Sequence, residues 1–218
     1  MKKIVPVSAF LLTVAIIVSS FIGVEKTPAF ASVTNNSKNF ATKWTLDKGH
    51  SNVKFTVTHM VVSDVDGSFK NFDGTVEHTK PDYSDAVVTF TVDVASVNTD
   101  NENRDKHLKS DDFFNAEKFP QMKFQSTSFK PLGGNKYQLD GNLTIRDITK
   151  PVSFEVTYGG SIDTQRGKKI GFKAKTTVNR FDYNLKWDRA TEAGSLVVAK
   201  EVVITINTEF NEVKTEVK

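Results

Sequence analysis

The chain of 218 residues contains no cysteine, and this absence excludes several kinds of fold and site. There is no disulfide framework, no thiolate-ligated zinc or iron–sulfur site, no cysteine nucleophile and no cysteine-linked lipid anchor. An excess of one charge is also missing, because 29 basic residues face 26 acidic ones. The fold must therefore be stabilised by its apolar core without disulfides.

The motifs of common enzyme classes are missing as well. The sequence has no G-x-S-x-G, no H-E-x-x-H, no G-x-x-x-x-G-K-[ST] and no G-x-G-x-x-G. A calcium loop over residues 101–112 is excluded because Lys106 stands where such a loop needs glycine. We interpret His50, His59 and His107 as a turn residue, a core group and part of a polar segment rather than as metal ligands. The sequence therefore predicts no catalytic residue, no metal site and no cofactor.

The first 31 residues differ in composition from the rest. Lys2 and Lys3 precede an uncharged apolar run over residues 7–24, and Ala29-Phe30-Ala31 follows as a small-x-small cleavage pattern. We predict a signal peptide over residues 1–31. The alternative is a retained anchor, because the run approaches the length of a membrane span. In either case the remaining chain is expected outside the cytoplasm, secreted or in the periplasm or cell envelope.

This division also changes the charge. The segment 1–31 carries Lys2, Lys3 and Lys26 against Glu25, so only +1 of the formal net charge of +3 belongs to residues 32–218. A nearly neutral chain without a basic cluster lacks the electrostatic surface that nucleic acids need, so we predict no nucleic-acid partner. Residues 32–43 are predicted to be a polar tether, 44–212 the folded domain and 213–218 a C-terminal tail.

Within residues 44–212 apolar and polar residues alternate with a period of two, which predicts strands with one buried face. Residues 99–118 interrupt the alternation and predict a short helical excursion, with Thr99 and Glu102 spaced as a capping box. About eight antiparallel strands close into a barrel or pack as a sandwich. The 17 phenylalanines, many on the alternating apolar face, favour an all-β antiparallel barrel. Such a barrel is either filled by its own side chains or holds one elongated apolar ligand.

Several spaced motifs, in order along residues 44–210, resemble the YceI-like family of secreted lipid-binding barrels. They are Trp44-Thr45-Leu46-Asp47-Lys48-Gly49-His50-Ser51, Val65-Asp66-Gly67-Ser68-Phe69, Ala95-Ser96-Val97-Asn98-Thr99, Asn103-Arg104-Asp105, His107-Leu108, Asp112-Phe113-Phe114, Thr149-Lys150-Pro151-Val152 and Asn179-Arg180-Phe181. One departure is Arg146-Asp147-Ile148, where a glycine often stands, and we expect it to alter only a turn.

The resemblance implies a lipocalin-like barrel whose lumen holds a long isoprenoid or a similar amphipathic chain. Residues 42–44 are Thr-Lys-Trp, where true lipocalins carry the G-x-W signature. The resemblance to lipocalins is therefore one of fold shape alone. The implied function is non-enzymatic binding, transport or storage of the lipid, with transient contact with a membrane surface. The oligomeric state, including a homodimer, stays open.

The alternating face supplies candidates for a lipid tunnel. They are Phe55, Val57, His59, Val88, Phe90, Val92, Met122, Phe124, Leu143, Phe154 and Phe172. Strand phase fixes the face of these side chains but not their depth, so some are expected to line the tunnel and others to fill its closed end.

A polar or phosphorylated head group needs donors at the mouth of the tunnel, and Arg104, His107 and Arg180 are the candidates. A structural role competes for each arginine: Arg104 in capping the excursion, and Arg180 in an ion pair across the barrel end. Two other classes of protein also stay open. One is an enzyme acting on a lipid-like substrate, with His59 as its inward-facing polar residue, and the other is a filled-barrel stress or structural protein without a ligand.

Overall fold

The computed structural model describes residues 41–185, 187–190, 194 and 197–214. The predicted signal peptide, and the tether up to residue 40, lie outside these residues. The strands are β1 (Thr42–Leu46), β2 (Asn52–His59), β3 (Ser63–Phe69), β4 (Phe72–His78), β5 (Val87–Asp93), β6 (Val97–Asn98), β7 (Gln121–Gly133), β8 (Lys136–Ile145), β9 (Ile148–Thr164), β10 (Gly167–Asn179) and β11 (Val198–Glu212). The helices are α1 (Glu102–Lys109) and the short 3-10 helices η1 (Lys48–His50), η2 (Val94–Ser96) and η3 (Arg180–Tyr183).

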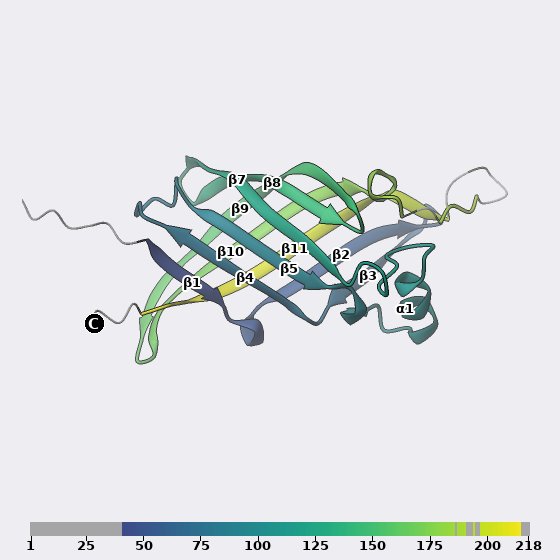
Figure 1. Ribbon diagram of the computed structural model, residues 1–218. Helices are drawn as coiled ribbons and strands as arrows, with labels where there is room; N and C mark the ends of the chain where they lie inside the picture. Colours follow the sequence, from purple (N-terminus) through teal and green to yellow (C-terminus); the bar gives the residue numbers. More distant parts are fainter. Residues whose placement is uncertain (1–40, 186, 191–193, 195–196, 215–218) are drawn as a thin grey trace, which may run out of the picture. The chain divides into compact units, whose positions relative to one another are not determined.

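The strands form one closed antiparallel barrel (Figure 1). β11 pairs with β10 along one edge and with both β1 and β2 along the other, so β1 and β2 act as one long strand interrupted by η1. In the same way β3 continues into β4, and β5 continues into β6. With β7 to β11 these make eight wall strands, and the pairing of β1 with β11 closes the circle. The predicted all-β antiparallel barrel of about eight strands is confirmed.

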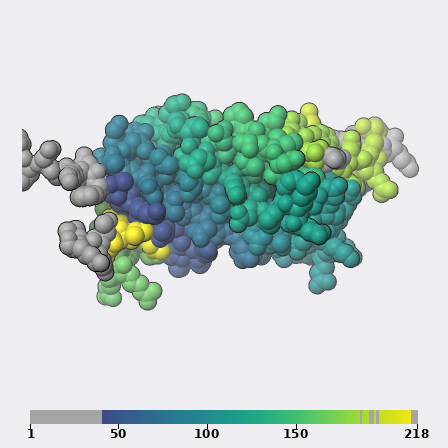
Figure 2. All heavy atoms as spheres, in the orientation of Figure 1, coloured from purple at the N-terminus to yellow at the C-terminus, as the bar shows by residue number. Residues whose placement is uncertain are grey.

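The period of two in the sequence determines the two faces of each strand. In β7, Met122 and Phe124 are buried inside the barrel, while Lys123 and Gln125 between them are exposed. On the face drawn in Figure 2 the side chains cover the barrel wall without a deep hollow between strands. Among the helices of the described residues, none is both long enough and apolar enough to cross a membrane.

One end of the barrel, which we call the aromatic end, is filled by rings. The indole Nε1 of Trp44 donates to Nε2 of His78 at 2.9 Å, and the His78 ring lies 4.5 Å from that of Tyr83. The Tyr83 hydroxyl donates to that of Tyr158 at 3.5 Å, and the Tyr83 ring stands edge-on to Phe172. Burial raises the pKa of Tyr83, which keeps the hydroxyl protonated as a donor. An interior space is therefore entered from the other end.

The opposite end, which we call the α1 end, carries the excursion, the β2–β3 turn (residues 60–62), the β8–β9 turn (residues 146–147) and η3 (Figure 1). The helix lies where the sequence placed it, but the predicted capping box is wrong. The side chain of Asn101 caps α1 by accepting from the Arg104 N–H at 3.0 Å. Thr99 instead bonds to the Asp105 carboxylate, which accepts its hydroxyl at 2.6 Å and its backbone N–H at 2.9 Å.

The first strand begins at Thr42, inside the predicted tether and two residues before the expected start of the domain. Thr42 and Lys43 continue the ladder opposite His78 and Glu77 of β4. Lys43 also forms an exposed ion pair with Glu77 at 2.8 Å. The backbone ladder, rather than the polar composition of this stretch, therefore decides where the barrel begins.

Candidate functional site

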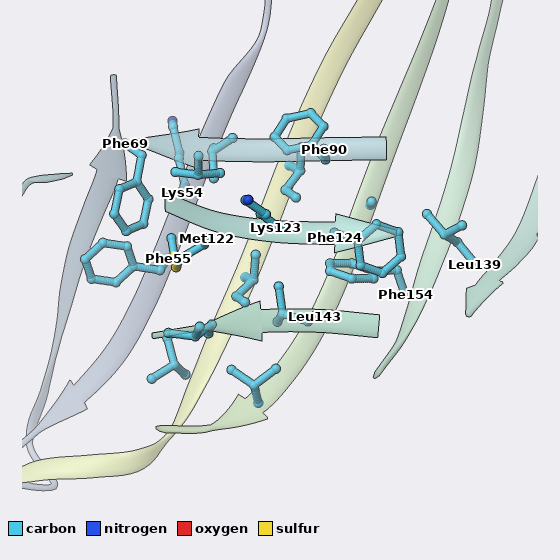
Figure 3. A pocket seen from close by; sticks show the side chains of 18 of the residues that line it. Lys54, Phe55, Phe69, Phe90, Met122, Lys123, Phe124, Leu139, Leu143 and Phe154 are labelled. Carbon is cyan, nitrogen blue, oxygen red and sulfur yellow. The ribbon is translucent and has the colours of Figure 1, made fainter. Parts of the chain in front are cut away.

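The barrel encloses a cavity of about 200 Å³. In Figure 3 rings from four strands of the wall, Phe55 (β2), Phe90 (β5), Phe124 (β7) and Phe154 (β9), lie around one space. Ten of the eleven residues predicted from strand phase line it, and the eleventh, His59, lies outside it. The ten are Phe55, Val57, Val88, Phe90, Val92, Met122, Phe124, Leu143, Phe154 and Phe172.

Glycines in the wall make room for three of these rings. A methyl group added at Gly67 would come within 2.2 Å of the Phe55 ring, and Gly74 and Gly141 stand in the same relation to Phe90 and Phe124. Phe55 is paired directly with Gly67 across β2 and β3, as Phe90 is with Gly74 across β5 and β4. Each ring lies over bare backbone of the adjacent strand, so it covers the wall and leaves the lumen free.

The lining residues that remain partly accessible are concentrated on β2 and β11. Phe124 and Phe154 are buried, whereas Val57, Ile204 and Ile206 stay partly accessible although they line the interior. An inward-facing side chain is accessible only where a space adjoins it, so these residues border the cavity directly. Selection by strand phase missed the β11 residues, although Val202-x-Ile204-x-Ile206 alternates as clearly as the chosen runs.

A second space, the mouth chamber, lies at the α1 end and has a volume of about 260 Å³. It shares five lining residues with the cavity, so an apolar path joins the two; the five are Phe55, Val57, Leu108, Phe113 and Val198. The remaining lining residues supply its polar groups and its rim: His59, Val65, Thr99, Arg104, His107, Trp187 and Val197. The fold therefore gathers four polar side chains beside the entrance of an apolar cavity.

Two of the three predicted head-group residues line this chamber. Arg104 is exposed and donates from Nε and Nη2 to the hydroxyl and carbonyl oxygens of Thr99, both at 2.7 Å. One edge of its guanidinium is thereby fixed, while Nη1 has no hydrogen-bond partner among the described residues. His107 contacts Asp112 through Nε2 at 2.9 Å and stands edge-on to the ring of Trp187. The imidazole is thereby oriented at the chamber wall.

Arg180 lines the cavity, but its contacts are structural. The buried guanidinium donates to the backbone carbonyls of Leu185, Trp187, Val198 and Ala199 at 2.7–3.0 Å. Burial lowers its pKa from the ordinary value. The alternative of an ion pair across the barrel end is not observed among the described residues, and four of the five N–H donors of Arg180 are instead used by carbonyl oxygens. Arg180 thus fixes the segment after η3 to the start of β11.

Arg146 has a similar structural role at the α1 end, and sequence reasoning missed it. Its backbone is left-handed, with φ 57°, and its side chain is buried. Nη1 donates to the carbonyls of Asp111, Phe113 and Asn184, and Nη2 pairs with the Asp111 carboxylate at 2.7 Å. The expectation that residues 146–148 alter only a turn is wrong, since this side chain joins three segments around the mouth.

The three histidines do not converge on one point. His59 and His107 line the mouth chamber, but His50 lies in η1 beside Asp47. Within the described part of the chain, Asp47, His50 and Glu209 are the one group of three potential metal ligands within 4.8 Å of one another. The Lys169 ammonium already lies between these carboxylates, 2.9 Å from Asp47 and 2.5 Å from Glu209. An ammonium there supplies the positive charge that a metal would otherwise bring.

Hydrogen bonds from Lys169 and His50 hold the pKa of Asp47 well below its ordinary value of 3.8. A depressed carboxyl pKa adds stability above the unfolded-state value, and this stability is lost as the pH falls toward the folded-state value. We expect Asp47→Asn to lower the free energy of unfolding by roughly 1 kcal/mol at pH 7. Urea titrations should show the gap to the unmodified protein closing below about pH 4. A gap that stays constant at lower pH would contradict this account.

The fold and cavity define a closed, eight-stranded antiparallel barrel with an apolar lumen. The family model for the YceI-like domain matches residues 44–210, and the chain belongs to this family. UPF0312 protein SA2479 from Staphylococcus aureus is 36% identical over 172 residues, which cover 78% of this chain and 98% of that protein.

Solved structures agree. The Campylobacter jejuni YCEI protein is 31% identical, with a TM-score of 0.62 over 78% of this chain and 97% of that chain. Burkholderia cenocepacia BcnA is 28% identical, with a TM-score of 0.63 over 75% and 98%. A polyisoprenoid binding domain from Saccharophagus degradans, 14% identical with a TM-score of 0.57 over 78% and 98%, shares the fold.

Proposed function

We propose that the chain binds a long isoprenoid, or a similar amphipathic lipid, in the barrel cavity and carries or stores it outside the cytoplasm without chemical change. The observation that carries this proposal is the apolar cavity that continues into a polar-lined mouth chamber. Membership of the YceI-like family supports it, as does the shared fold of a domain described as polyisoprenoid-binding. The signal-peptide pattern of residues 1–31 supports the location.

The tail is retained by its removal from water. Burial of one methylene contributes about 0.8 kcal/mol, so several isoprenoid units need no polar contact inside the cavity. The partly accessible residues of β2 and β11 form the surface on which we place the chain. The free space also favours a ligand over the filled-barrel alternative, in which side chains would occupy the whole interior.

We place the head group in the mouth chamber, close to Arg104, His107 and His59. The Nη1 side of Arg104 offers donors to phosphate or carbonyl oxygens, and Thr99 fixes the opposite edge of the guanidinium. Arg180 contributes indirectly, by holding the chamber wall formed by Trp187 and Val198. The head group thus meets charge at the entrance while the tail meets hydrocarbon inside.

Arg104→Gln tests the head-group assignment. We expect the Kd for a polyprenyl phosphate to rise about tenfold, because a charge-assisted contact is lost, while the Kd for the matching polyprenol stays unchanged. Both are measured by displacement of a fluorescent polyprenol from the purified protein. An equal loss for both lipids would assign Arg104 to the structure of the excursion alone.

The proposed function itself is tested by loading. The purified protein is mixed with solanesol, a polyprenol, in detergent micelles and separated by size exclusion. We expect one lipid per chain, recovered unchanged after prolonged incubation. Recovery of a modified lipid would support the enzyme alternative, and a barrel that takes up no lipid would support the filled-barrel alternative.

A further inference from the structure

The β2–β3 turn exposes three apolar side chains in succession. Met60, Val61 and Val62 are 47%, 69% and 85% exposed. Single exposed apolar residues are ordinary on protein surfaces, whereas a run of three at the tip of a hairpin is not. The β7–β8 hairpin at the aromatic end exposes Leu132, but its other tip residues are Gly133, Gly134 and Asn135.

The turn is held in a conformation that its residues adopt reluctantly. Met60 and Val61 have φ values of 51° and 65°, in the left-handed region that disfavours β-branched side chains. The Met60 N–H donates to the carbonyl of Val197 at 2.8 Å, and the Val62 N–H donates to that of His59 at 3.2 Å. Strained residues of this kind persist where surrounding contacts fix them, and they cluster at functional sites.

The turn also adjoins the entrance to the cavity. His59 precedes the turn, Val65 follows it in β3, and Val197 accepts a hydrogen bond from it; all three line the mouth chamber. Val65 pairs with Val57, which lines both the chamber and the cavity. Apolar surface therefore continues from the exposed tip to the lumen.

The charges beside the turn indicate what kind of surface it meets. The carboxylates of Asp64 and Asp66, which follow the turn in β3, accept hydrogen bonds from Thr58 and Thr56 at 2.9 and 2.6 Å. Residues 58–66 contain no lysine or arginine, so the hairpin itself carries no ammonium or guanidinium group that would select anionic head groups. An uncharged apolar tip fits the interfacial layer of a neutral bilayer.

We propose that the tip, residues 60–62, inserts into the surface of a lipid bilayer and places the mouth chamber against it, so that a lipid enters without crossing water. This inference rests on the proposed function, since the bilayer is the source of an insoluble lipid. The left-handed turn holds Val61 and Val62 outward as an insertion point. The tip then controls the rate of lipid exchange with membranes and leaves the capacity of the cavity unchanged.

The test uses the double variant Val61→Asn, Val62→Ser and measures two quantities: the rate of lipid uptake from vesicles and the amount of lipid bound per chain. Asparagine tolerates a left-handed φ, so the variant is expected to be at least as stable as the unmodified protein. From phosphatidylcholine vesicles containing solanesol, we expect uptake about tenfold slower, because less apolar area is buried at the membrane. Uptake from detergent micelles should reach the same one lipid per chain. Leu132→Ser, at the aromatic end, is the matched control and should change neither the uptake rate from vesicles nor the amount of lipid bound per chain.

Other outcomes overturn the proposal. Equal uptake rates from vesicles for variant and control would show that the tip does not meet the membrane. A matching loss of uptake from micelles would show that it shapes the chamber instead. A dimer of the unmodified protein that the variant abolishes, seen by sedimentation, would assign the tip to a second copy of the chain. Failure of the unmodified protein to load from micelles would instead contradict the proposed function.

Discussion

Ile204→Asp is expected to abolish lipid retention while leaving the barrel folded. Ile204 lines the cavity from the middle of β11 and remains partly accessible to it, so the carboxylate would stand in the free space rather than within packed side chains. An ionised group facing an apolar lipid tail costs several kcal/mol, which corresponds to a loss of at least about a hundredfold in affinity. The measurement is the amount of solanesol retained per chain after size exclusion.

Thr205→Asp is the matched control, because Thr205 is the next residue of the same strand and faces outward. Its ladder partners are Lys54 and Lys175, which accommodate a negative charge. We expect it to retain lipid as the unmodified protein does. Equal retention by the Ile204 variant and this control would place the lipid somewhere other than the lumen.

Phe90 and Phe124 are less suitable for this test, although strand phase singles them out. Both rings are buried and lie against glycine backbone of the adjacent strand. Loss of a buried phenylalanine costs about 3–5 kcal/mol, so a charged replacement would weaken the fold as well as the site. Accessibility toward the cavity, rather than phase alone, distinguishes a residue that borders the ligand from one that holds the wall.

Arg180→Met has the second large expected effect, and it acts on stability. Four backbone carbonyls around the guanidinium would lose their donor together, and each buried acceptor left without a partner costs about 1–3 kcal/mol. We expect the free energy of unfolding in urea to fall by about 3–5 kcal/mol. The replaced chain keeps its apolar stem, so the loss reports on the hydrogen bonds.

Arg166→Met serves as the control for this variant, because Arg166 is exposed in the β9–β10 turn at the aromatic end. It should change the free energy of unfolding by less than about 0.5 kcal/mol. A similar small change for Arg180→Met would show that water replaces the guanidinium at those carbonyls, and would remove its role in fixing the mouth.

The barrel was predictable from the sequence because apolar and polar residues alternate along most of its strands. Phe90 between two threonines, and Phe124 between Lys123 and Gln125, already determine which side of the wall faces inward. The pairing of β1 with β11 that closes the barrel could not be predicted from the sequence, since it joins residues more than 160 positions apart. The position of a residue along the barrel axis could not be predicted either, because the alternation of apolar and polar residues is the same at both ends of a strand.

The mouth chamber shows what local patterns cannot supply. It combines residues from 55–65 and 99–113 with residues 187, 197 and 198, which only the closed barrel brings together. Arg104 and His107 could be selected as side-chain donors in the polar excursion, whereas Arg146 looked like an ordinary turn residue. Its role follows from the carbonyl groups of residues 111, 113 and 184, and their convergence is a property of the fold.

The most direct measurement is organic extraction of the protein purified from the cells that make it, followed by mass spectrometry of the extract. The account predicts one isoprenoid or similar amphipathic lipid per chain from the unmodified protein, and none from Ile204→Asp purified in the same way. An unmodified protein that yields no lipid, or an Ile204 variant that yields the same lipid in the same amount, would contradict it.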